Sequence, residues 1–227
     1  MDDAKPQGEA PWALQLAVRV ERTDRPTVAE VCRAAAAATL ALLEDERARP
    51  GGVWQPSIAA WRSARIRKLV RRGRGGQWLA AQSLPGVTVH EGAEVRAFLP
   101  APMDAIDPAL AKLQIDASAV ELHEPEPCDT IRASNGCLVV ALTPLVAMSW
   151  AKRAAQAAHG AQLAWEAASP GELAAWQAQS RRVEAVFPSA SAWPAIVAAA
   201  LVQVHDGGFT EIPAGTLTAV AWFVPQR

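Results

Sequence analysis

Two groups of polar residues in the second half of the chain have types and spacing that suit acid–base chemistry. In AKRAAQAAHGAQLAW, Lys152, Gln156 and His159 are spaced i, i+4 and i+7, so they share one face of a helix whose other residues are mostly alanine. In HDGGFTEIPAGTLTAVAW, Asp206 is followed at once by two glycines. A lysine ammonium beside a carboxylate can orient water and stabilise an oxyanion. The two groups together predict a site of that kind.

The second group sits on tight turns that also carry hydroxyl side chains. Glycines at 207–208 permit the positive φ of a sharp turn, and residues 213–215 (Pro-Ala-Gly) form a second turn signal. Residues 216–222 alternate polar and apolar, as a half-buried strand does. An acid and its neighbouring hydroxyls are therefore expected at strand ends, where α/β proteins tend to place chemistry.

The elements that must position these residues alternate between strands and helices. Thr27 with Glu30 three residues later predicts a capping box, and Ser149 predicts an N-cap. The ends of the strands at Leu142 and before Asp206 are expected to reach the same edge of a parallel pair. Strands are expected at 12–22, 94–100, 114–122, 136–142, 182–188, 201–205 and 216–222. Helices are expected at 28–46, 106–113, 150–167, 172–179 and 192–200.

Composition bounds the class of protein. The 227 residues carry a net charge of −1, so no global field attracts nucleic acid or an anionic membrane. The polar start is not a signal peptide, and the alanine runs are too short and too charged to span a membrane. Cys32, Cys128 and Cys137 lack metal-ligand spacing and predict free thiols in a reducing cytosol. We expect a soluble, cytoplasmic α/β protein without metal or cofactor.

One stretch departs from this charge balance. WRSARIRKLVRRGRGGQW, at 61–78, contains many cations and no acid. Read as a helix, it places Arg65, Lys68 and Arg72 on one face. It can be a solvated amphipathic helix or a phosphate-binding patch, and the sequence leaves both interpretations open. The candidate phosphate ligands are Arg65, Lys68, Arg71 and Arg72.

Two passages near the N-terminus resemble passages of the second half. One constant offset places Thr23 opposite Thr143 and Arg33 opposite Arg153, across a strand and an alanine-rich helix. Chance similarity between alanine-rich helices is the alternative to duplication here. A second match, of residues 94–122 with residues 182–212, favours duplication.

In these two alignments the first unit lacks the polar residues of the second unit, although Asp116 stands where Asp206 does. The residues at the corresponding places are Cys32 for Lys152, Ala36 for Gln156, Thr39 for His159 and Val120 for Thr210.

From about Gly136 onward the chain resembles the type II (archaeal and eukaryotic) peptidyl-tRNA hydrolase family. That family carries a helix start of the form Lys-hydrophobic-Ala-Ala-Gln-x-x-His and a terminal Asp-x-Gly-x-Thr run followed by Gly-x-x-Thr. The matching residues here are Lys152, Ala154, Ala155, Gln156, His159, Asp206, Gly208, Thr210, Glu211, Gly215, Thr216 and Thr218.

The resemblance implies a fold and an organisation for the chain. The fold is a three-layer α/β/α sandwich around a small mixed sheet, in a family that is commonly dimeric. With a degenerate N-terminal copy, one chain can mimic the dimer as a monomeric pseudo-dimer; a homodimer is the alternative. The expected divisions are a polar tail at 1–11, a degenerate unit with the basic insertion at 12–128, and a hydrolase-like unit at 129–227.

The resemblance also implies an activity, hydrolysis of the ester between a peptide and the 3′ ribose of tRNA, with no cofactor. Asp206 would orient or deprotonate water with the help of Thr210, and Lys152 would stabilise the oxyanion. The basic stretch would grip the acceptor stem. The expected substrate-binding residues are Thr143, Gln156, His159, Thr216 and Thr218.

The alternative function is that of a catalytically weak or inactive relative that binds tRNA or another protein. Pro144 stands where the family has an aspartate, Ala151 replaces a glycine, and the first unit is eroded; these departures favour the alternative. A polar helix face that is merely an interface would leave both motifs unexplained.

Overall fold

The computed structural model describes residues 10–64, 67–115, 120–208 and 211–225, which form two sheets. The first sheet has the strand order β2-β1-β4-β3, and the short β5 also pairs with β1. Its strands are β1 (Trp12–Arg19), β2 (Lys68–Gly73), β3 (Gly86–His90), β4 (Glu94–Phe98) and β5 (Ala101–Pro102). The second sheet has the order β7-β6-β9-β8. Its strands are β6 (Leu138–Leu142), β7 (Val183–Val186), β8 (Val202–His205) and β9 (Leu217–Phe223).

The helices follow the strands in the same order in both halves of the chain. Those of the first half are α1 (Val28–Glu44), the 3-10 helix η1 (Glu46–Ala48), α2 (Gln55–Ser63), α3 (Gly75–Ala81) and α4 (Pro108–Ala111). Those of the second half are α5 (Trp150–Ala167), α6 (Pro170–Ala178) and α7 (Trp193–Ala199).

The two sheets have one topology. In each, the first strand runs parallel to the second and antiparallel to the last, which pairs with the third. Strand β1 thus corresponds to β6, β2 to β7, β3 to β8 and β4 to β9, and α1 corresponds to α5. The prediction of an α/β protein built from two related units is confirmed.

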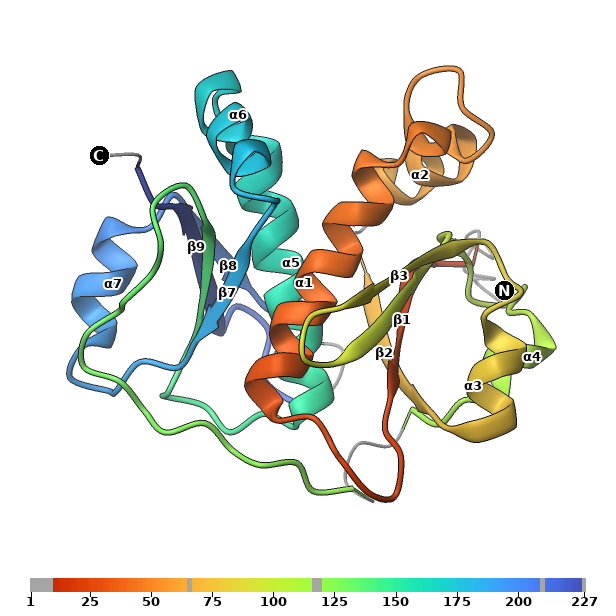
Figure 1. Ribbon diagram of the computed structural model, residues 1–227, viewed down its shortest axis with the longest axis horizontal. Helices are drawn as coiled ribbons and strands as arrows, with labels where there is room; N and C mark the ends of the chain where they lie inside the picture. Colours follow the sequence, from red (N-terminus) through yellow and green to blue (C-terminus); the bar gives the residue numbers. More distant parts are fainter. Residues whose placement is uncertain (1–9, 65–66, 116–119, 209–210, 226–227) are drawn as a thin grey trace, which may run out of the picture.

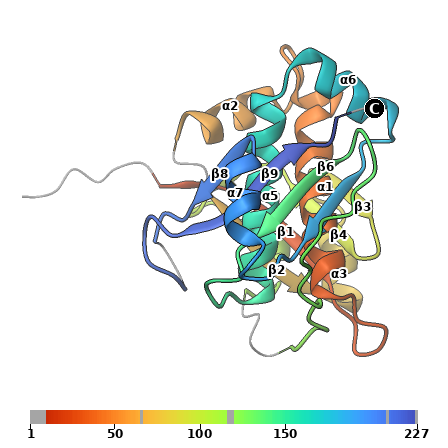
Figure 2. The ribbon, with the colours of Figure 1, turned by 90° about the vertical axis from the view of Figure 1, so that its left-hand side faces the viewer.

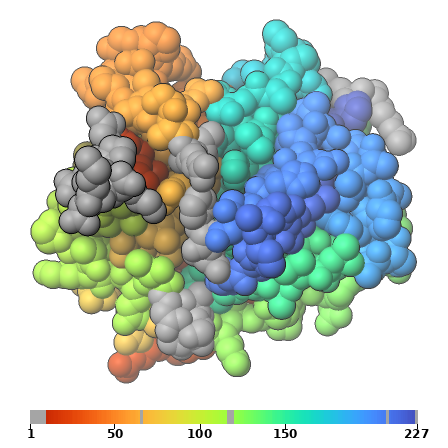
Figure 3. All heavy atoms as spheres, turned by 180° about the vertical axis from the view of Figure 1, so that it is seen from behind, coloured from red at the N-terminus to blue at the C-terminus, as the bar shows by residue number. Residues whose placement is uncertain are grey.

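The units share a central helical layer. Helices α1 and α5 lie side by side between the two sheets, while α7 covers the outer face of one sheet and α3 that of the other (Figure 1). Seen from the side, α7 stands in front of the second sheet and α5 behind it (Figure 2). Each sheet is therefore the middle of an α/β/α sandwich, as expected. The two units form neighbouring lobes, one orange to yellow-green and the other teal to blue (Figure 3).

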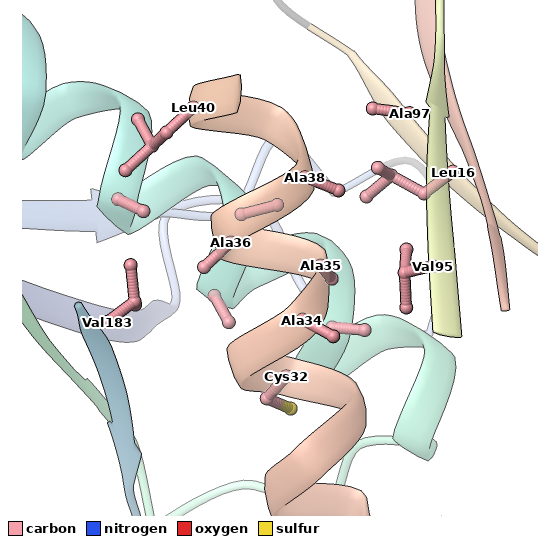
Figure 4. Close-up of a cluster of buried hydrophobic side chains, with 14 of the residues drawn as sticks. Leu16, Cys32, Ala34, Ala35, Ala36, Ala38, Leu40, Val95, Ala97 and Val183 are labelled. Carbon is pink, nitrogen blue, oxygen red and sulfur yellow. The ribbon is translucent and has the colours of Figure 1, made fainter. Parts of the chain in front are cut away.

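Alanines let the helices of the central layer approach both sheets. The alanines of α1 at 34, 35, 36 and 38 are fully buried between strands of the two units (Figure 4). On α5, a Cβ built at Gly160 would lie 3.1 Å from Val140 Cγ1, so this helix also lies close to its own sheet. Small residues thus give one continuous core between the two sheets, shared by both units.

Matching contacts define which residues correspond. Trp61 Nε1 donates to Arg67 O at 3.1 Å, and Trp176 Nε1 donates to Arg182 O at 3.0 Å. Each carbonyl also accepts from the first strand of its sheet, from Leu14 N in one unit and from the corresponding backbone N–H in the other, both at 3.0 Å. The two tryptophans therefore occupy equivalent positions in α2 and α6.

The contacts between the units follow the same symmetry. Glu44, at the end of α1, accepts from Gln177 Nε2 of the other unit at 3.0 Å. Glu166, at the end of α5, pairs with Arg62 of the other unit at 2.8 Å. The two glutamates and their two partners occupy equivalent places in the repeat. The chain thus has an internal pseudo-two-fold arrangement.

The correspondence corrects the sequence alignment of the two halves. Residues 94–98 form β4, which matches β9, whereas residues 183–186 form β7, which matches β2. The predicted match of residues 94–122 with residues 182–212 is therefore wrong. The N-caps Thr27 and Ser149 correspond, so Glu30, rather than Cys32, stands at the position of Lys152. Asp116 lies outside the described residues.

Of the two interpretations left open for the stretch at 61–78, the solvated amphipathic helix is wrong. The segment contains the end of α2, all of β2 and the start of α3. Residues 68–73 pair in parallel with β1 along its length, and this pairing outweighs the local helical pattern. Lys68 and Arg71 therefore point to opposite faces of a strand.

Candidate functional site

Helix α5 begins where the sequence predicts and carries the first half of the site. Ser149 is its N-cap, and Ser149 Oγ accepts from Lys152 N at 3.1 Å. Lys152 is consequently the third residue of the helix, with Gln156 and His159 on the following turns. The predicted capping box of α1, formed by Thr27 and Glu30, is confirmed as well.

A loop between β8 and β9 carries the second half. Asp206 N donates to Thr216 O at 2.9 Å, and Gly215 N donates to Asp206 O at 2.8 Å, so the two ends of the loop are fastened together. Gly208 has φ +75 and donates its N–H to Asp206 Oδ1 at 2.8 Å. Its backbone lies so close to Ala214 that a Cβ would come within 2.7 Å. The loop fixes both the position and the orientation of the carboxylate.

The end of β6 and the end of β8 reach the same edge of the sheet, as predicted. They are not a pair, however, because β9 lies between them and runs antiparallel to both. In the first unit the equivalent strands β3 and β4 are joined only by residues 91–93. The loop at 206–216, with its aspartate, is thus a longer connection that the second unit alone possesses.

Helix and loop meet at the Asp206 carboxylate. Lys152 Nζ lies 2.6 Å from Asp206 Oδ2, with 11% and 5% of the two side chains exposed. Gln156 Nε2 donates to the same oxygen at 2.6 Å. Thr218 Oγ1, which is buried, lies 2.8 Å from Gln156 Oε1 and 3.1 Å from Val204 O. The chain of contacts runs from a lysine through a carboxylate and an amide to the sheet.

This arrangement can hold charge in a largely desolvated place. Three donors fasten the Asp206 carboxylate, two at Oδ2 and one at Oδ1. A carboxylate oxygen can accept more than one hydrogen bond, so Oδ1 retains acceptor capacity for a water molecule. An ammonium 2.6 Å away acts on such a site more strongly than it would in bulk water. The geometry therefore suits activation of water next to a cation.

His159 lies farther along the same face, between two charged groups. The pKa of His159 is lowered to about 3, mainly by burial and also by the positive charge of Lys68, while Asp206 opposes the shift. The imidazole is neutral at pH 7 and can offer one donor and one acceptor. His159 is thus electrostatically linked to Asp206 without an ion pair to it.

The first unit places a cation beside α5. Lys68, at the start of β2, donates to Gln162 Oε1 at 2.5 Å, and its ammonium lies 5.2 Å from the Trp61 ring centroid. Burial lowers the pKa of Lys68 to about 7, with Glu166 opposing the shift. The sequence did not predict this neighbour, because Lys68 and Gln162 are 94 positions apart in the chain. The continued spacing of polar residues on α5, at 162 and 166, is the signal that could have indicated a partner there.

The threonines predicted for substrate binding lie around the site. Thr143 is 7% exposed, and its backbone N–H donates to Thr218 O at 2.9 Å. Thr143 Oγ1 accepts from Leu145 N at 3.3 Å. Thr216 Oγ1 donates to Pro213 O at 2.8 Å, within the loop. Thr210, predicted to hold the water, lies outside the described residues.

The expected phosphate ligands do not form one patch. Arg71 is 4% exposed, and it donates to Gln15 Oε1 at 2.5 Å and to Leu113 O at 3.0 Å. Lys68 is engaged by α5, as described above. Arg72 follows Arg71 on the same strand and therefore points to the opposite face. Arg65 lies outside the described residues.

Sequence reasoning also missed a contact that joins helix to loop. Glu211 Oε2 accepts from Ser149 N at 2.8 Å, and Glu211 Oε1 accepts from Ser149 Oγ at 2.6 Å. The sequence signal is that α1 and α6 have a glutamate three residues after the N-cap, whereas α5 has Lys152 there. The capping acid of α5 comes instead from a residue distant in sequence.

The described residues contain no group of three His, Cys, Asp or Glu side chains that could hold a metal ion. All three cysteines are free thiols, and burial raises the pKa of Cys32 to about 12. Within the described part of the chain, no helix combines the length and apolar character needed to span a membrane.

Fold and site together define a two-unit α/β protein with a lysine–aspartate pair in one unit. In comparisons with protein-family models, with curated proteins and with solved structures, no match was found.

Proposed function

We propose that the chain is a cytoplasmic ester hydrolase that acts on peptidyl-tRNA. The scissile bond is the ester between the peptide, or an N-blocked amino acid, and the 3′ ribose. The observation that carries this proposal is the 2.6 Å contact between Lys152 Nζ and Asp206 Oδ2. It joins the two motifs on which the resemblance to type II peptidyl-tRNA hydrolases depends.

The proposed reaction uses Asp206 as a base and Lys152 as an electrostatic stabiliser. Asp206 orients a water molecule and takes a proton from it as the water oxygen attacks the ester carbonyl carbon. Negative charge then develops on the carbonyl oxygen, and the Lys152 ammonium stabilises it. The carbon–oxygen bond to the ribose breaks, and the 3′ oxygen takes up the proton from Asp206. The products are a carboxylic acid and tRNA with a free 3′ hydroxyl.

The other predicted residues divide into two groups by their contacts. Gln156 donates to Asp206, and Thr218 contacts Gln156, so we assign them the holding of Asp206 rather than contact with substrate. Thr143, His159 and Thr216 remain the candidates for binding the terminal nucleotide. We assign no phosphate contact to Arg71, because its guanidinium is already bonded inside the fold.

The test is hydrolysis of an N-blocked aminoacyl-tRNA, measured as release of the blocked amino acid. Asp206→Asn and Lys152→Ala should each lower kcat/KM by at least about a hundredfold. Arg153→Ala is the matched control, because Arg153 is the next residue of α5 and pairs with Glu124 instead. Full activity in both site variants would refute the assignment.

A non-catalytic relative that binds tRNA or a protein is the second candidate. The observation that favours it is the full engagement of Asp206 Oδ2 by two donors, which suits a structural ion pair. Binding of uncharged tRNA that weakens steeply with salt, without hydrolysis of the ester, would select this function.

A further inference from the structure

The N-terminus of α5 is capped in a way that differs from the capping boxes of α1 and α6. In a capping box, the N-cap hydroxyl accepts from the backbone of the third helical residue, whose own carboxylate accepts from the N-cap backbone N–H. Helices α1 and α6 have such boxes, Thr27 with Glu30 and Ser169 with Glu172. In α5 the third residue is Lys152, which cannot accept a hydrogen bond.

A carboxylate from the loop at 206–216 takes the place of the local one. Glu211 accepts from Ser149 N at 2.8 Å and from Ser149 Oγ at 2.6 Å. The corresponding distances between Glu172 and Ser169 are the same, 2.8 and 2.6 Å. The N-cap of α5 is therefore fully satisfied, with the carboxylate supplied by a residue distant in sequence.

This replacement bears directly on the candidate site. The loop that carries Glu211 also carries Asp206. Because Glu211 supplies the capping carboxylate, the third position of α5 need not be a glutamate, and Lys152 occupies it. One pair of hydrogen bonds thus fastens the aspartate loop to the end of α5 that holds the lysine. In the first unit Glu30 caps its own helix, and the connection between β3 and β4 is only residues 91–93.

We propose that Glu211 is a positioning residue of the candidate site: it caps α5 from the 206–216 loop in place of a local glutamate, so that the third helical position can hold Lys152 against Asp206. The inference rests on the proposed function for its kinetic consequence alone. Its geometric consequence, a Lys152 ammonium held in place by the cap, can be measured in the absence of any turnover.

The measurement is the acylation rate of Lys152 by an amine-reactive ester, followed by peptide mass spectrometry on the full chain. The lysine is shielded by its pair with Asp206, so Glu211→Ala should raise this rate on the order of tenfold, as expected for loss of roughly one capping interaction. Glu211→Gln should restore slow acylation, because an amide can accept from Ser149 N through its oxygen and donate to the hydroxyl oxygen. A Gln variant as reactive as the Ala variant would contradict the inference.

Glu172→Ala is the matched control, since it removes an equivalent capping carboxylate from α6. Both Ala variants should lower Tm by a similar amount, about 2–4 °C for one capping interaction. Only Glu211→Ala should alter the acylation of Lys152 and, if the chain hydrolyses the ester, kcat. Equal acylation rates in the wild type and in both Ala variants would overturn the inference. Absence of hydrolysis by the wild type would count against the proposed function alone.

A second arm tests the replacement itself. Lys152→Gln puts a residue at the third position that can close a local capping box. The loss of Tm caused by Glu211→Ala should then be smaller in the Lys152→Gln background than in the wild type. An undiminished loss would show that Glu211 does not substitute for a local capping residue.

Discussion

Lys152 and Asp206 form an ion pair of 2.6 Å that joins a helix N-terminus to a loop of the same unit. At the place of Lys152, the first unit has Glu30, which caps its own helix. The pair therefore distinguishes two units that otherwise share their topology, and it is the feature on which the following expectations depend.

Removing one charge of the Lys152–Asp206 pair should lower the free energy of unfolding more than removing both charges. Lys152→Met leaves the Asp206 carboxylate without its cation, and we expect a loss of about 3 kcal/mol in the free energy of unfolding. The double variant Lys152→Met with Asp206→Leu should regain part of that loss, because neither charge remains. Denaturant unfolding of the single and double variants measures this coupling. Simple additivity of the two single effects would contradict it.

Gly208 should be less replaceable than Gly215, although both have positive φ (+75 and +82). A Cβ at position 215 would have no atom within 4 Å. Gly215→Ala therefore costs only the backbone strain of the left-handed region, about 1 kcal/mol. Alanine at 208 also drives its Cβ to 2.8 Å from Ala214 N and displaces the N–H that holds Asp206 Oδ1. We expect a larger loss of thermal stability for Gly208→Ala. Equal losses would mean that the loop relaxes freely.

His159 should make stability depend on pH. Burial lowers its folded pKa to about 3 from the ordinary value of 6.5, so between these values the unfolded chain binds a proton that the folded chain does not. The contribution is therefore complete above pH 6.5 and is lost as pH falls toward 3. His159→Gln should flatten this part of the stability curve in urea unfolding at pH 4.5 to 7.5. A curve of unchanged slope in the variant would place the titration elsewhere.

The chain should be a monomer in solution, since one chain already contains both halves of the pseudo-dimer. Helix α1 of the first unit covers α5, and polar contacts such as Glu44 with Gln177 close the edges of that contact. Sedimentation equilibrium should give a mass near 24.1 kDa over a wide range of concentration. A stable homodimer would show that another face of the chain associates.

Much of the local structure could be predicted from the sequence. Helix α5 spans the expected residues 150–167 and has the expected cap, because apolar period and capping residues act between neighbours in the chain. The buried strand β6 and the turn after Asp206 likewise follow from runs of apolar residues and from paired glycines. Local pattern was also enough to place Lys152, Gln156 and His159 on one face.

The sequence misled where distant partners outweighed the local pattern. The cation-rich stretch could be interpreted as a helix, yet pairing with β1 makes residues 68–73 strand β2, with Arg71 turned toward Gln15. The alignment of the halves failed for a related reason. Similar short strings occur in β4 and β7, but only the hydrogen-bonded order of strands shows which strands correspond.

The sequence by itself determined the helices α1, α5, α6 and α7, the turn after Asp206 and the list of polar residues that a site would need. Only the tertiary structure decided that Asp206 accepts from both Lys152 and Gln156 at 2.6 Å, and that Glu211 caps α5. The physical reason is distance along the chain. Backbone periodicity and capping depend on residues a few positions apart, whereas these contacts require β9 between β6 and β8 and the alanine-rich helix packed on the sheet.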